Sequence, residues 1–76
     1  MMQTQDLEFI MKSIRQYLQM RPESADTVEG IARFWIDWPG EALPVSAVLQ
    51  VLENMRNASE LESRNVGGRT IWRARR

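Results

Sequence analysis

The apolar residues of this chain recur at helical spacing in three segments and then change to an alternating pattern. In the first segment, residues 6–20, most of them lie three or four positions apart, which aligns them on one face of a helix. Asp6 is the predicted N-cap of this helix. The residue before Pro22 is disfavoured in the α region, so we expect the helix to end there. The apolar face consists of Leu7, Ile10, Ile14, Tyr17 and Leu18.

A second helix is predicted at residues 26–37. Asp26 and Glu29 have the spacing of a capping box, with Asp in place of the usual Ser or Thr, and Ser24 is a rival start. Pro39 and the glycine that follows it form a strong break, which ends the helix. The buried face of this helix is expected to consist of Val28, Ile31, Ala32 and Trp35.

A third helix is predicted at residues 44–58. Pro44 suits its first turn, where the missing N–H costs nothing. The Asn-Ala-Ser run at residues 57–59 ends it. Its buried face is expected to consist of Val45, Val48, Leu49, Leu52 and Met55.

Residues 60–75 predict a β-hairpin. The turn is placed at residues 65–68, because its two glycines adopt positive φ without steric cost. Residues 69–75 alternate in the way that is typical of a half-buried strand. A lone hairpin is only marginally stable in water, so we expect this one to pack on the helices through Leu61 and Trp72.

Length and composition limit the kind of protein this is. The 76 residues are room for one domain, with residues 1–5 and 75–76 expected to be flexible. The chain has no Cys and no His, so we expect no disulfide, no metal site and no cofactor. Without His it lacks the usual acid–base catalyst at neutral pH, and without Cys it lacks a thiol nucleophile. We also expect so small a chain to form no pocket of several hundred Å3. An enzyme is therefore not expected, and no small-molecule substrate is indicated.

The N-terminal residues and the length of the apolar stretches indicate where in the cell the protein is expected. The N-terminal residues have no basic start followed by an apolar run, so no signal peptide is predicted. No apolar stretch approaches the roughly 20 residues needed to cross a bilayer. We therefore expect a cytoplasmic protein without a membrane partner.

The charges of the chain are unevenly distributed. Its ten basic and ten acidic residues cancel overall. Residues 1–40 hold four basic and six acidic residues, whereas residues 41–76 hold six and four. Four of the last eight residues are Arg, and none is acidic. This basic end is the one electrostatic indication of a partner.

The order of three helices and a hairpin resembles the winged-helix family of helix-turn-helix domains. The third helix and the strand after it, residues 44–64, match the spaced aliphatic residues and the Leu-Glu start seen in that family. Gly67 and Gly68 stand at the wing, and Trp72 stands where the returning strand of the family usually carries an inward Tyr. Residues 25–32 resemble the second helix of the family. The resemblance covers about residues 6–74 and implies an α+β fold, mainly helical, with a C-terminal two-stranded hairpin.

What the resemblance implies about function is DNA binding by a small, dimeric transcriptional regulator. In the family the third helix enters the major groove, where polar side chains read base edges. The matching positions that would read bases here are Ser46, Gln50 and Asn54. The positions that would hold phosphates are Arg64, Arg69 and Arg73.

A second hypothesis remains open, in which the same scaffold binds a protein partner or a second copy of itself and no DNA. The third helix is nearly uncharged, and the loop between the second and third helices is longer than a minimal turn. The positions Phe34, Ile36 and Trp38 lie off the main stripe of the second helix or beyond it. If they are exposed they form an apolar patch, and such patches mark interfaces. The alternative is that the core takes them in.

Overall fold

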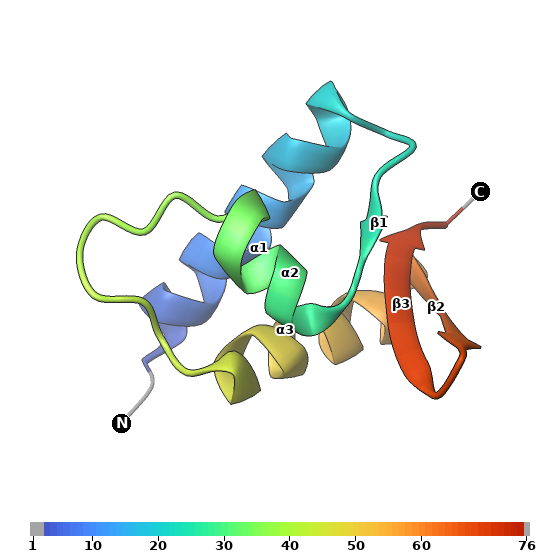
Figure 1. Cartoon of the computed structure of the whole chain (residues 1–76). Coiled ribbons are helices and arrows are strands. Elements are labelled where there is room, and N and C mark those ends of the chain that lie inside the picture. The colour runs from blue at the N-terminus through green and yellow to red at the C-terminus, as the bar shows by residue number, and fades with distance from the viewer. Residues whose placement is uncertain (1–2, 76) are drawn as a thin grey trace.

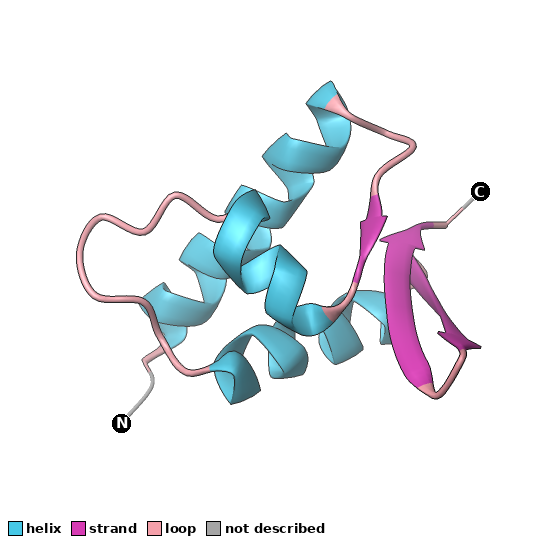
Figure 2. Ribbon diagram, in the orientation of Figure 1, coloured by secondary structure: helices cyan, strands magenta, loops and turns pink. Residues whose placement is uncertain are grey.

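The computed structural model describes residues 3–75, which form a mainly helical α+β domain (Figure 1). Three helical segments pack together, and a three-stranded antiparallel sheet lies at one end of them (Figure 2). The elements in chain order are α1 (Thr4–Met20), β1 (Ala25–Asp26), α2 (Val28–Gly30), the π-helical turn η1 (Ile31–Trp35), α3 (Val45–Asn57), β2 (Leu61–Val66) and β3 (Arg69–Ala74).

The first helix starts earlier than the sequence predicts. Helix α1 begins at Thr4, and Gln3 is its N-cap. Asp6 is therefore not the cap but the third helical residue, and its carboxylate accepts a hydrogen bond from the Gln3 backbone N–H at 3.1 Å. At the other end, the N–H of Arg21 donates to the Tyr17 carbonyl at 2.8 Å. Of the termini expected to be flexible, residues 1–2 and 76 lie outside the described residues.

The predicted start of the second helix at Asp26 is wrong. Asp26 belongs to the short strand β1, where it pairs with Trp72 of β3. Thr27 caps the helix instead, since its hydroxyl accepts from the Gly30 N–H at 3.2 Å. The carboxylate of Asp26 in turn accepts from the Thr27 N–H at 2.7 Å. The expected capping box is absent because residue 26 is held in the sheet.

The second helix also ends differently from the prediction. It continues from α2 into the π-helical turn η1 and stops at Trp35, two residues before the expected end. Ile36 has extended backbone angles, φ −116° and ψ 124°. The Trp38 indole N–H then donates to the Ala32 carbonyl at 2.8 Å. This bond satisfies one of the carbonyl groups that the end of a helix leaves without a backbone partner.

The hairpin of β2 and β3 is present, with a shorter turn than predicted. Strand β2 extends to Val66, which pairs with Arg69, so that only Gly67 and Gly68 form the turn. Their φ angles of 60° and 81° explain the glycines. Strand β1 adds to the free side of β3 and gives the order β1-β3-β2, a third strand that the sequence did not predict. It ties the hairpin to the chain that enters α2.

Most of the predicted core is confirmed. The exception is Val45, which is 41% exposed, whereas Ile36, Ala47 and Val51 are buried without having been predicted. Tyr17 and Trp35 stack with ring centroids 4.7 Å apart, which joins α1 to η1. The fully or nearly buried positions that were predicted are Ile10, Ile14, Ile31, Ala32, Trp35, Val48, Leu52, Met55, Leu61 and Trp72. Those that pack on this core while partly buried are Leu7, Tyr17, Leu18, Val28 and Leu49.

The sequence led us to expect no membrane-crossing segment, and the length and composition of the helices can be compared with that expectation. Among residues 3–75, no helix combines the length and the apolar character that spanning a bilayer requires.

Candidate functional site

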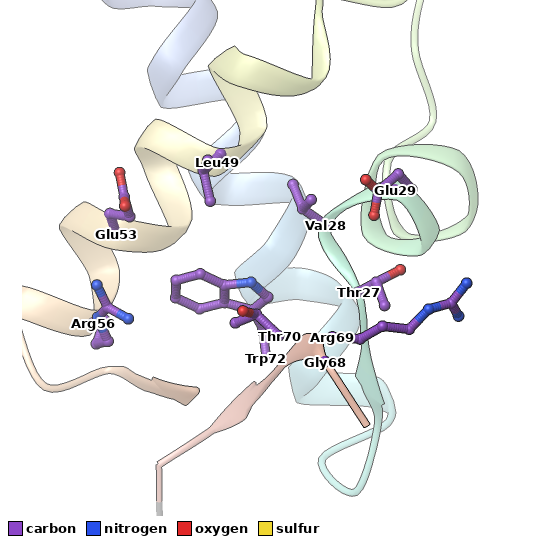
Figure 3. A pocket seen from close by; sticks show the side chains of 10 residues that line it. All are labelled: Thr27, Val28, Glu29, Leu49, Glu53, Arg56, Gly68, Arg69, Thr70 and Trp72. Atoms are coloured by element: carbon purple, nitrogen blue, oxygen red, sulfur yellow. The ribbon is translucent and has the colours of Figure 1, made fainter. Parts of the chain in front are cut away.

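An open groove of about 620 Å3 lies where the start of α2, the outer side of α3 and strand β3 meet (Figure 3). Its size contradicts the expectation that so small a chain forms no pocket of several hundred Å3. Strand β3 is held beside the start of α2 by its pairing with β1. The side chains that line it come from all three elements: Thr27, Val28, Glu29, Leu49, Glu53, Arg56, Gly68, Arg69, Thr70 and Trp72.

Trp72 and Arg56 form the best-defined contact of the groove. Trp72 is 2% exposed, and its ring lies between α3 and the start of α2 (Figure 3). The Arg56 guanidinium carbon lies 5.0 Å from the centroid of that ring, within the range of a cation–π contact. Nη1 of Arg56 also donates to the Ser63 hydroxyl at 2.8 Å. Arg56 is therefore held against the sheet.

The structure separates the three positions of α3 that the resemblance assigned to base reading. Ser46 and Gln50 are exposed on the side of α3 that faces away from the core. Asn54 is also exposed, but it lines a different hollow, about 180 Å3 in volume, between α3 and α1. Leu7 and Met11 of α1 line the same hollow. Glu53, which the prediction passed over, lines the groove instead.

The three arginines assigned to phosphates also differ in their surroundings. Only Arg69, beside the turn, lines the groove. Arg73 donates from Nε to Glu62 at 2.6 Å, so its charge is matched within the hairpin. Arg64 pairs across the sheet with Ile71. Because Trp72 points toward the helices and successive strand residues alternate, Arg64, Arg69 and Arg73 all start from the opposite face of the hairpin, and only Arg69 borders the groove, at its edge beside the turn.

The charged residues that line the groove have a net formal charge of zero. Glu29 and Glu53 supply its two negative charges, and Arg56 and Arg69 its two positive charges. Figure 3 shows Glu53 and Arg56 projecting from α3, with Glu29 and Arg69 on the far side of Trp72. The sequence contained no signal for this set, because the four residues line one groove only once Trp72 of β3 packs between α3 and the start of α2.

The predicted apolar patch of the second helix is not exposed as a whole. Phe34 is 72% exposed, as that hypothesis requires. Ile36 is only 5% exposed and belongs to the core. Trp38 is half-buried, and its ring packs on Phe9 with centroids 5.9 Å apart. The early end of the helix is the cause, since it turns Ile36 inward.

Two further observations bear on the site. Within residues 3–75, no three acidic side chains gather into an arrangement that could hold a metal ion. Comparison of the chain with protein-family models, with curated proteins and with solved structures gave no match.

Proposed function

We propose that the chain is a winged-helix domain that binds duplex DNA and acts as a small, non-enzymatic regulator of transcription. In this proposal α3 enters the major groove, and the β2–β3 hairpin is the wing. The order of the elements supports it, because three helices are followed by a hairpin whose turn lies on the same side of the molecule as α3 (Figure 1).

The observation that carries the proposal is that Arg69 of the hairpin lines the same groove as Glu53 and Arg56 of α3. Arg69 is exposed at the tip of the hairpin, across the groove from Glu53 and Arg56. An exposed helix face with hydrogen-bonding side chains and a cation on the neighbouring hairpin is an arrangement that major-groove binding uses. Ser46 and Gln50 supply the hydrogen-bonding groups on that face.

The arginines of the hairpin differ in whether an acidic side chain already neutralises them, and this difference affects how well each can bind phosphate. Within residues 3–75, Arg64, Arg69 and Arg75 form no ion pair, whereas Arg73 is neutralised by Glu62. A guanidinium without an acidic partner is available to displace counterions from DNA. We therefore assign the main backbone contact to Arg69, a supporting one to Arg64, and the weakest to Arg73.

The test is fluorescence anisotropy with a labelled, mixed-sequence duplex of about two helical turns, at low and at physiological salt. Wild-type protein is expected to bind at low salt and to weaken steeply as salt rises. Replacing Arg69 by Ala should lower the affinity and reduce the slope of log K against log salt by about 1. Lys12→Ala is the matched control, because Lys12 is an exposed cation on α1 that does not line the groove.

Of the three residues named for the protein-interaction hypothesis, only Phe34 is largely exposed, since Ile36 is buried and Trp38 is fixed by its hydrogen bond. One exposed aromatic residue is not a patch of the size that marks an interface. Absence of DNA binding at low salt would remove the first proposal and return attention to this surface.

A further inference from the structure

Glu53 places a negative charge on the surface that is proposed to meet DNA. It is exposed, it lines the groove, and within residues 3–75 it forms no ion pair. Arg56, the nearest cation on the same helix, is directed instead onto Trp72 and Ser63. A carboxylate in this position repels phosphates, so it lowers the affinity for DNA of any sequence unless a base supplies it with a donor.

The rotation of α3 places Glu53 at the centre of its outer face. The buried side of the helix is formed by Ala47, Val48, Val51, Leu52 and Met55. Each residue turns the helix by about 100°, so Ser46, Gln50 and Glu53 fall within a narrow sector opposite that side. Asn54 is turned by about 100° from Glu53, toward α1, in agreement with the hollow that it lines.

The chemistry of base edges decides what this carboxylate accepts. In the major groove, cytosine offers only its N4 amino donor, whereas guanine offers two acceptors and thymine an acceptor beside a methyl group. Adenine has a donor, but its N7 acceptor lies next to it and repels a second acceptor. An ionised carboxylate is an acceptor only, so it favours cytosine and disfavours the other three bases.

Gln50 is placed to read the base pair next to the one that Glu53 contacts. It lies one turn before Glu53 on the same sector, about 4.5 Å away along the axis, close to the roughly 3.4 Å rise of one base pair. A glutamine amide pairs with both N6 and N7 of adenine. With α3 lying along the major groove as proposed, the two side chains would reach adjacent base pairs.

We propose that Glu53 is a specificity-determining residue, which selects a C·G pair next to an A·T pair read by Gln50, and that Asn54 contacts no base. This inference rests on the proposed DNA binding. It replaces the set Ser46, Gln50 and Asn54 with the set Ser46, Gln50 and Glu53. Arg69 supplies affinity for the backbone, and Glu53 converts part of that affinity into discrimination.

The experiment is selection of binding sites from random duplexes by the full chain, followed by anisotropy on the selected site and its single-base variants. The wild-type protein should select adjacent A and C, with each wrong base costing about tenfold in affinity. Glu53→Gln should change the preferred base from C to A at that one position and raise the affinity for non-selected DNA. Gln50→Ala should relax the adjacent position only.

The matched control is Asn54→Ala, the neighbouring polar position on the same helix, which should leave the selected sequence unchanged. Circular dichroism establishes that each variant is folded. Equal affinity for all sequences, with binding still dependent on Arg69, would overturn the role of Glu53 and leave the proposed function intact. A consensus that Asn54→Ala relaxes and Glu53→Gln does not would overturn the new reading set. No binding at low salt would remove both proposals.

Discussion

The carboxylate of Asp26 occupies the space that a side chain at residue 30 would need. A Cβ added to Gly30 would overlap the terminal atoms of Asp26. Gly30 has ordinary right-handed helical angles, φ −63° and ψ −41°, so its backbone conformation does not call for glycine. The requirement is one of space, because the same carboxylate is held in place by the Thr27 N–H.

We predict that Gly30→Ala destabilises the domain, although alanine is the better helix former. Alanine gains about 1 kcal/mol in helix propensity. It displaces the Asp26 carboxylate, however, and the lost charge-assisted hydrogen bond costs about 2 kcal/mol. A net loss of about 1 kcal/mol should appear in urea unfolding followed by tryptophan fluorescence.

The sign of this effect should reverse when Asp26 is removed. In an Asp26→Ala background nothing occupies the space, so Gly30→Ala should stabilise by about 1 kcal/mol through propensity alone. The double-mutant cycle measures the coupling between the two residues. An equal effect of Gly30→Ala in both backgrounds would refute the steric explanation.

The sequence predicted the elements whose evidence is local. The apolar stripes of α1 and α3 and the two glycines of the hairpin turn need no distant partner, and all three features were found. The start of the second helix was missed because Asp26 is an acceptable cap in isolation. Only its pairing with Trp72, 46 positions later, makes residue 26 part of a strand.

The candidate site was less predictable, for the same reason. Helical periodicity placed both Glu53 and Asn54 on the exposed part of α3, and it could not tell which one faces the hairpin. That choice depends on how α3 rotates against α1 and the sheet. Asn54 lines a hollow with Leu7, whereas Glu53 lines the groove with Trp72.

Trp38 should be sensitive to loss of its indole nitrogen. Trp38→Phe keeps an aromatic ring against Phe9 and removes the 2.8 Å hydrogen bond to the Ala32 carbonyl. A net hydrogen bond contributes about 1 kcal/mol, and we expect a loss of this size in urea unfolding. A stability equal to that of the wild type would show that water replaces the bond at no cost.

The exposed ion pair of Arg15 with Glu60 should contribute little. Its partners lie 2.7 Å apart, but their side chains are 45% and 36% exposed. Exposed pairs are screened and typically contribute less than about 1 kcal/mol. Arg15→Ala should therefore shift the urea midpoint only slightly, and adding salt to the wild type should have a similarly small effect. A loss above about 2 kcal/mol would mean that Arg15 supports the fold in another way.

Phe34 lies in the last turn of the second helix and Ile36 directly after it, and the same substitution should affect the stability strongly at one position and hardly at all at the other. The helix ends in a π-helical turn, after which the extended backbone of Ile36 directs its side chain into the core while Phe34 stays 72% exposed. Ile36→Ser removes a buried aliphatic side chain and places a hydroxyl in the core, at a cost of about 4 kcal/mol. A domain of this size has only about 5–10 kcal/mol of stability, so this variant should be largely unfolded at modest urea concentration.

Phe34→Ser should change the stability by no more than about 0.5 kcal/mol. If the two variants unfolded at the same urea concentration, the end of the helix would not be where the structure has it, and Phe34→Ser could not serve as the folded variant for testing protein partners.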